Sequence, residues 1–256
     1  MTFLTATNTD IGTRKKTNQD SMLVMQADTI RGRVAFAAMC DGMGGLAKGE
    51  VASAAMVRSL EAWFMHQFPA LLEQGGGEAD LFAQWGGLVD DTNRLIANYG
   101  RDLHVNLGTT CAAVLIMEGR YYIMNVGDSR IYKISNGTYL LTKDQSYVQR
   151  EIDNGRMTEQ QALTDPHRSV LLQCIGASSD VYPDYYTGDA GPNEVFMLCC
   201  DGFRHVILPE EFYQAFYPPY MTTREFMEQR IMEVIRLNIE RHEDDNISAI
   251  LIKIND

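Results

Sequence analysis

Five aspartates stand at the ends of predicted β-strands, and they are the residues of this chain best suited to chemistry. Each lies beside a short apolar run, and the five are Asp20, Asp41, Asp128, Asp201 and Asp245. An aspartate at a strand end is held on rigid backbone, and an adjacent glycine lets another segment approach closely. A single Asp-Gly pair is most often a turn, but turn chemistry does not account for five aspartates placed in this way.

Carboxylates that converge at one edge of a sheet repel one another unless a cation neutralises them. A set of oxygen ligands suits hard divalent ions such as Mg²⁺ or Mn²⁺. Two such ions about 3.5–4 Å apart can lower the pKa of a bridging water and give hydroxide near neutral pH. That hydroxide could attack phosphorus in line while the ions and a protein cation stabilise the developing charge.

Other hydrolytic chemistries lack their sequence signatures. No cysteine is followed by arginine at the sixth position, as the loop of a cysteine phosphatase requires. The chain also has no G-x-S-x-G, H-E-x-x-H or Walker-A motif, so a serine nucleophile, a zincin site and a P-loop are not predicted.

The elements that must position these aspartates are mainly strands. Short apolar or β-branched runs bounded by turn signals predict seven strands: Ser21–Gln26, Val34–Cys40, Thr109–Met117, Tyr121–Val126, Arg130–Ser135, Val195–Cys200 and Ile247–Ile254. The turn pairs Glu118-Gly119 and Asn136-Gly137 predict an antiparallel meander from Thr109 to Leu141.

Three segments have a helical pattern of apolar residues. They are Gly49–Gln67, Leu81–Asn98, and a segment that begins with the capping-box pair Thr222 and Glu225. The glycine-rich stretch from Glu73 to Glu78 is predicted to connect two helices. Antiparallel groups of strands separated by long helices favour an α+β fold, in which packed sheets carry helices on the outside.

The composition excludes several classes of protein. The 256 residues include 45% hydrophobic residues, which is ordinary for a globular chain and argues against disorder. With 22 basic and 34 acidic residues, the net charge of −12 disfavours binding to nucleic acid or to anionic membranes. No apolar run is long enough for a transmembrane helix, and the N-terminus lacks the features of a signal peptide.

The five cysteines are an odd number and lie mostly in apolar runs. This pattern favours buried free thiols over a disulfide framework or a zinc site, and therefore predicts a cytoplasmic protein.

The motifs around the aspartates resemble those of the metal-dependent protein phosphatases of the protein phosphatase 2C family, in its bacterial form. They span residues 10 to 248 and occur in family order: Asp10-Ile11-Gly12, Asn18-Gln19-Asp20, Asp41-Gly42-Met43-Gly44-Gly45, Gly49-Glu50, Gly108-Thr109-Thr110, Gly127-Asp128-Ser129-Arg130-Ile131-Tyr132, Leu141-Thr142-Lys143-Asp144, Cys200-Asp201-Gly202 and Asp245-Asn246-Ile247-Ser248. One such motif is a weak signal, but the ordered set is specific.

The resemblance implies one catalytic domain over residues 1–256, built as a four-layer α-β-β-α sandwich of two antiparallel sheets flanked by helices. It implies two Mn²⁺ or Mg²⁺ ions per site, with Asp41 as the bridging carboxylate and the Gly42 carbonyl as a further ligand. Asp201 and Asp245 match the other ligands of the first ion, and Asp20 matches the position that holds waters of the second. Asp128 matches a residue that helps bind a third ion in bacterial relatives.

Two basic residues compete for the role of binding substrate phosphate. The family usually has arginine five residues before the Asp20 position, where this chain has Lys15, with Arg14 next to it. The family spacing favours Lys15, whereas the bidentate geometry of a guanidinium favours Arg14. A solvated basic turn is the alternative interpretation. The five histidines have no motif support and are predicted to be structural or exposed.

The resemblance implies a phosphatase that hydrolyses phosphoserine and phosphothreonine in proteins by attack of the metal-bridging hydroxide, without a phosphoenzyme intermediate. Its partners would be phosphoproteins made by a cognate Ser/Thr kinase, and the chain is expected to be a monomer. The alternative is a catalytically silent phosphatase-like protein that binds a phosphorylated partner. The presence of all four aspartates at the positions of the two-metal site favours the enzyme.

Overall fold

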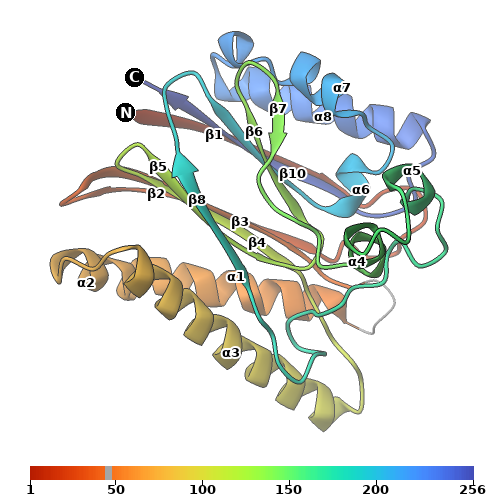
Figure 1. Ribbon diagram of the computed structural model, residues 1–256. Coiled ribbons are helices and arrows are strands. Elements are labelled where there is room, and N and C mark those ends of the chain that lie inside the picture. The colour runs from red at the N-terminus through yellow and green to blue at the C-terminus, as the bar shows by residue number, and fades with distance from the viewer. Residues whose placement is uncertain (44–47) are drawn as a thin grey trace.

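Two five-stranded antiparallel sheets pack face to face in the computed structural model, which describes residues 1–43 and 48–256 (Figure 1). One sheet has the order β1 (Thr2–Asp10), β10 (Ile247–Asn255), β9 (Val195–Cys199), β6 (Arg130–Ile134) and β7 (Thr138–Leu140). The other has the order β2 (Asp20–Thr29), β3 (Gly32–Asp41), β4 (Cys111–Met117), β5 (Arg120–Val126) and β8 (Asp184–Asp189).

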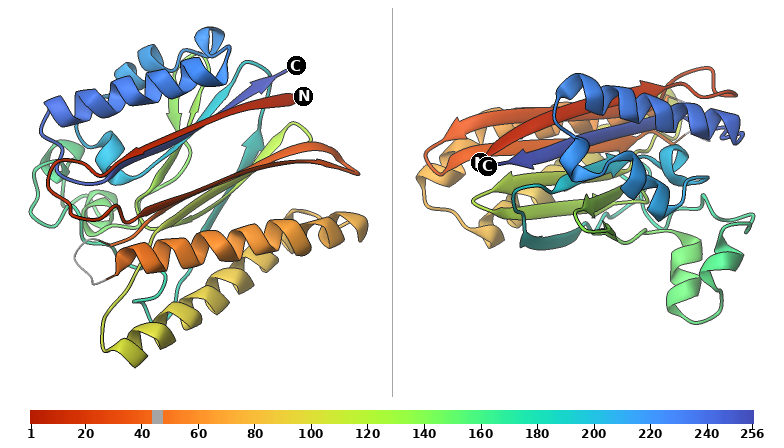
Figure 2. Two further views of the ribbon diagram at one scale, coloured as in Figure 1. Left: turned by 180° about the vertical axis from the view of Figure 1, so that it is seen from behind. Right: turned by 90° about the horizontal axis from the view of Figure 1, so that it is seen from above.

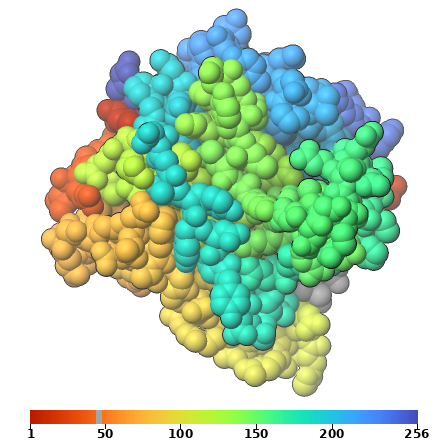
Figure 3. Space-filling model, viewed as in Figure 1, coloured from red at the N-terminus to blue at the C-terminus, as the bar shows by residue number. Residues whose placement is uncertain are grey.

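Helices cover the outer face of each sheet, so the predicted four-layer sandwich is confirmed (Figure 2). The sheet that contains β2 and β3 is covered by α1 (Gly49–His66), α2 (Phe68–Glu73) and α3 (Glu78–Leu103). The sheet that contains β1 and β10 is covered by α7 (Pro209–Ala215) and α8 (Arg224–Glu240). The shorter helices are α4 (Tyr147–Asp153), α5 (Glu159–Ala162) and α6 (Asp201–Arg204), with a 3₁₀ turn over Pro218–Tyr220. In the space-filling view, α4 and α5 form a green lobe beside the sandwich (Figure 3).

The central strands are buried on both faces, which explains why they read as continuous apolar runs. In β3, Ala37 and Met39 belong to the core between the sheets. The alternate residues Phe36 and Ala38 belong to the core beneath the helices. The ring of Phe36 packs there against both tryptophans of the chain at centroid distances of 5.4 and 6.1 Å. The β3 backbone is therefore fixed from both sides up to its last residue.

All seven predicted strands form, with ends that shift by up to three residues, but β1, β7 and β8 were not among them. The predicted meander over Thr109–Leu141 is wrong at its centre. The strand β5 pairs with β4 and β8, whereas β6 pairs with β7 and β9 in the other sheet. The chain crosses between the sheets at Gly127, which has a φ of +98° that glycine adopts without strain.

The predicted helices and the connection between α2 and α3 are confirmed. The cap of α8 differs by one residue, since Thr223 rather than Thr222 is the N-cap and its hydroxyl accepts from the Phe226 N–H at 3.2 Å. Within residues 1–43 and 48–256, no helix combines the length and apolar character needed to cross a bilayer.

Candidate metal centre

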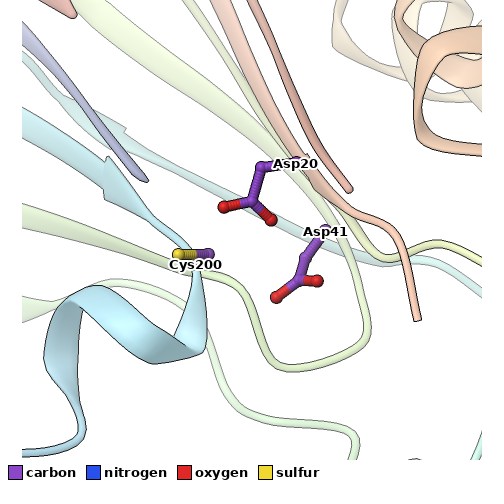
Figure 4. A group of neighbouring side chains, drawn as sticks. All are labelled: Asp20, Asp41 and Cys200. Carbon is purple, nitrogen blue, oxygen red and sulfur yellow. The ribbon is translucent and has the colours of Figure 1, made fainter. Parts of the chain in front are cut away.

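Asp20 and Asp41 are brought together by strand register. They are the first residue of β2 and the last residue of β3, and they pair directly across the antiparallel ladder. Paired residues on neighbouring strands project from the same face of a sheet. Figure 4 shows their carboxylates on the same side of the two strands, at the edge where the sheet ends.

The backbone of Asp41 is fixed by the motif that contains Thr110. The Thr110 hydroxyl accepts from the Asp41 N–H, and the Thr110 N–H donates to the Asp41 carbonyl, both at 2.9 Å. The Thr110 hydroxyl also lies 2.7 Å from that of Ser129. At Gly42 a Cβ would lie 2.4 Å from the Gly49 carbonyl oxygen, so only glycine fits there. Gly44 and Gly45 of the predicted motif lie outside the described residues.

Asp201 and Asp245 arrive from the other sheet. Asp201 begins α6 directly after β9, and Asp245 lies just before β10. Their segments approach so closely that a Cβ at Gly202 would lie 2.2 Å from the Asn246 carbonyl oxygen. The Asn246 side chain holds this region to the N-terminal segment, because it accepts from the Gln19 N–H and donates to the Ile11 carbonyl at 2.9 Å each. Both sheets therefore contribute carboxylates to one edge.

Mutual repulsion and burial are visible in the pKa values of these groups. Burial, with the charges of Asp201 and Asp245, raises the pKa of Asp20 to about 7. Burial and the surrounding carboxylates also raise the pKa of Asp41 well above its usual range. Asp128 has a pKa of about 7, because burial and the charge of Asp201 outweigh the charge of Arg204. The carboxylates of Asp20 and Asp41 are thus poorly neutralised by the side chains around them.

Two buried carboxylate oxygens support a cation at this edge. Oδ1 of Asp20 and Oδ1 of Asp201 are buried and have no hydrogen-bond partner among the described residues. The other Asp20 oxygen accepts from the Ser248 hydroxyl at 2.5 Å. Unpartnered buried carboxylate oxygens are costly, and they are the ligand atoms that Mg²⁺ and Mn²⁺ prefer. The donor set therefore fits a divalent ion.

Cys200 is a neighbour that sequence reasoning did not place at the site. Its sulfur and one carboxylate oxygen each of Asp20 and Asp41 lie within 4.8 Å of one another (Figure 4). Burial and the nearby carboxylates raise the pKa of Cys200 well above its usual range, so the group stays a neutral thiol. The sulfur accepts from the Ser248 N–H at 3.1 Å. Cys200 thus belongs to the packing beneath the carboxylates.

The two candidate cations for phosphate binding are placed differently. Lys15 Nζ lies 2.6 Å from Asp245 Oδ1, and the lysine side chain is 28% exposed. Its burial acts to lower its pKa, but the bond to Asp245 and the charges of Asp41 and Asp201 outweigh burial and raise it. Arg14 instead pairs with Asp244 at 2.9 Å, and its side chain is 76% exposed. Of the two, Lys15 lies at the carboxylate cluster.

His205 lies next to the site, between the segments that carry Asp201 and Glu243. It is 3.6 Å from Asp201 and 3.5 Å from Glu243. The other oxygen of Glu243 accepts the backbone N–H of Asp245 at 3.0 Å. His205 thus links the segments of Asp201 and Asp245, and its place beside Asp201 was not predicted. Their i,i+4 spacing at the start of a helix was the available signal.

The raised pKa of Asp20 makes the metal-free protein sensitive to pH. An aspartate titrates near 3.9 when unfolded and at about 7 here, so the folded state binds the proton more tightly. This contribution to stability is present at low pH and is lost as the pH rises through about 7. In EDTA we expect the melting temperature to fall by at least about 5 °C between pH 5 and pH 8. A loss of a few kcal/mol in the free energy of unfolding would produce a change of this size.

Asp20→Asn should lose less stability than wild type over the same pH range, as measured by thermal melts in EDTA. Asp28→Asn is the matched control, because Asp28 lies on the same strand with a side chain that is 80% exposed. A wild-type protein whose melting temperature rises between pH 5 and pH 8 would contradict this prediction.

Comparison with known proteins agrees with this geometry. The family model described as Protein phosphatase 2C matches residues 12–238. A Streptococcus pyogenes protein designated protein phosphatase 2C-type is 29% identical, over 95% of this chain and 94% of its own length.

Solved structures give the same result. The serine/threonine phosphatase of S. agalactiae superposes with a TM-score of 0.85 at 26% identity, covering 99% of this chain and 100% of its own. The catalytic domain of the serine/threonine phosphatase PstP, solved with two manganese ions, gives a TM-score of 0.77 at 25% identity, with 99% of each chain covered. With its strand-end aspartates at one edge of a four-layer sandwich, this chain belongs to the protein phosphatase 2C family.

Proposed function

We propose that this chain is a metal-dependent phosphatase that removes phosphate from phosphoserine and phosphothreonine in proteins, with residues 1–256 forming one catalytic domain. The observation that carries the proposal is the convergence of carboxylates from both sheets on one edge. Buried oxygens of Asp20 and Asp201 there have no hydrogen-bond partner within residues 1–43 and 48–256. Without a cation, these carboxylates destabilise the folded protein. Such a cost is expected of a site whose function is to bind a cation.

The proposed site would hold two Mn²⁺ or Mg²⁺ ions through Asp41, the Gly42 carbonyl, Asp20, Asp201 and Asp245. Bound there, the ions would supply a nucleophile from water at neutral pH and neutralise phosphate, so no phosphoenzyme intermediate is required. The chain's own task is to keep the carboxylates in place before substrate arrives. The Thr110 bonds to the Asp41 backbone support this role, and so does the His205 contact with Asp201.

Lys15 is proposed to bind the substrate phosphate. Its ammonium group is fixed at the carboxylate edge by Asp245, and an incoming phosphate could accept a hydrogen bond from it. Arg14 offers a better fork for phosphate, but its contact with Asp244 turns it toward solvent.

Lys15→Ala should raise KM for a phosphopeptide by about tenfold or more, because a hydrogen bond to a charged group is worth about 1.5–3 kcal/mol. Arg14→Ala is the matched control and should change KM less than about threefold. Steady-state kinetics on both variants, with Mn²⁺ titrations to show that metal affinity is retained, test this assignment. It fails if Arg14→Ala has the larger effect or if neither variant changes kcat/KM.

The proposed partners are phosphoproteins that a Ser/Thr kinase has modified. The phosphatase itself is proposed to be a monomer that binds neither nucleic acid nor membranes. The net charge of −12 supports the last two points. All five cysteines are free and buried, which supports a reducing, cytoplasmic setting.

Release of phosphate separates the enzyme from a catalytically silent binding protein. The purified chain with Mn²⁺ should release inorganic phosphate from phosphoserine and phosphothreonine peptides over many turnovers. Binding of the same peptides without release, measured by fluorescence anisotropy on the same protein preparation, would instead establish the silent alternative.

A further inference from the structure

Asp128 differs from the other aspartates of the site because a protein cation already contacts it. It lies in the connection from β5 to β6, and Nη2 of Arg204 donates to its backbone carbonyl at 3.0 Å and lies 3.5 Å from its Oδ2. Both side chains are about nine-tenths buried, with exposed fractions of 8% and 10%. The contact is therefore shielded from solvent on both sides.

The guanidinium of Arg204 is held in place by further contacts. The same Nη2 lies 3.3 Å from Asp144 Oδ2. Asp144 is itself held by a two-bond contact from Arg130, at 2.8 and 2.9 Å. Arg204 is the last residue of α6, three positions after Asp201, so the helix that presents a metal-binding carboxylate also presents this cation. Arginine stays charged at every relevant pH.

Protein cations are thus distributed unevenly over the carboxylates. Asp20 and Asp201 each have a buried oxygen without a hydrogen-bond partner among the described residues, whereas Asp128 and Asp144 both lie next to Arg204, and Asp144 is also bound by the partly buried Arg130. A divalent ion at Asp128 would lie close to the guanidinium, and at that range two positive charges in a shielded site repel strongly. The Asp128 side of the cluster therefore has its positive charge supplied by the protein.

We propose that Arg204 takes the place of a third divalent ion beside Asp128, so that the centre binds two ions and not three. The inference rests on the proposed function, since it assumes that Asp20, Asp41, Asp201 and Asp245 bind metal. It assigns Asp128 a positioning role, in which its backbone carbonyl fixes the Arg204 end of α6 and, through that helix, the place of Asp201. Asp128→Asn keeps this carbonyl.

The experiment counts bound Mn²⁺ by equilibrium dialysis with elemental analysis, and measures affinity by calorimetry. The wild-type protein should bind two ions. Asp128→Asn should also bind two, each with an affinity within about threefold of wild type. Arg204→Met should gain a third, weaker ion at the freed carboxylate of Asp128, since Asp144 keeps its two bonds from Arg130. Arg130→Met is the matched control, because Arg130 contacts Asp144 but not Asp128, and it should still bind two.

Three ions in the wild-type protein would overturn the inference and leave the proposed function intact. The loss of an ion, or a tenfold loss of affinity, in Asp128→Asn would also overturn it, and this variant decides the matter if Arg204→Met does not fold. A folded Arg204→Met that binds only two ions would refute the role given to Arg204. A wild-type protein that binds no Mn²⁺ would overturn the proposed function and this inference together.

Discussion

Asp41→Asn should reduce phosphate release from a phosphoserine peptide by more than about a thousandfold. Asp41 is the one carboxylate proposed to contact both ions, and the loss of a single preorganised charge-stabilising group already costs about 10²–10³ in rate. The substitution keeps the shape of the side chain, and its backbone bonds to Thr110 remain, so the protein should stay folded.

The control for this variant is Asp189→Asn, which removes the same charge from a side chain that is 95% exposed. Its kcat/KM should stay within about twofold of wild type, since isolated surface charges contribute little. Steady-state assays at saturating Mn²⁺ compare the two variants. Equal losses in Asp41→Asn and Asp189→Asn would show that Asp41 has no special role.

Removal of divalent ions should have an effect of similar size. Dialysis against EDTA should lower the rate by at least about a thousandfold. The ions contribute several kcal/mol to stabilisation of the transition state, and each 1.4 kcal/mol changes the rate tenfold. Addition of excess Mn²⁺ or Mg²⁺ should restore activity, since both are hard ions that oxygen ligands bind. Circular dichroism of the EDTA-treated protein checks that the loss of activity is not a loss of fold. Undiminished turnover in excess chelator would exclude the metal-dependent mechanism.

The central strands were predictable because burial on both faces leaves a strong signal. Val34–Cys40 and Val195–Cys200 are continuous apolar runs, and each ends within one residue of the observed strand. Strand β1 was missed because its only fully buried residues are Phe3 and Ala6, set among threonine and asparagine. Its place is determined by pairing with β10 at the far end of the chain, which no local pattern encodes.

The path from β5 to β6 shows a different limit of sequence reasoning. Two tight turns predicted consecutive hairpins, and both hairpins exist. Local signals could not predict that the chain changes sheet between the two hairpins, because this change depends on close packing of Gly127 against Thr110. The same crossing places Asp128 beside Arg204, a partner that sequence spacing did not suggest.

The carboxylates of the site were recognised from their positions at strand ends, whereas their neighbours were not. Strand ends can be read from apolar runs, so Asp20, Asp41 and Asp201 could be assigned to an edge. His205 carries no motif and reaches the site through tertiary packing. Cys200 stands in the Cys200-Asp201-Gly202 motif, but the motif did not indicate that its sulfur lies beside Asp20 and Asp41. The distinction between Lys15 and Arg14 likewise depends on which of two adjacent acids each contacts.

Diffraction from crystals grown with Mn²⁺, recorded near the manganese absorption edge, tests the central claim most directly. The account predicts two anomalous peaks at the edge where β2 and β3 end, both in contact with Asp41, one of them also bound by Asp201 and Asp245. It predicts no peak at Asp128. Manganese bound elsewhere, with no peak beside Asp41 at saturating Mn²⁺, would contradict the account.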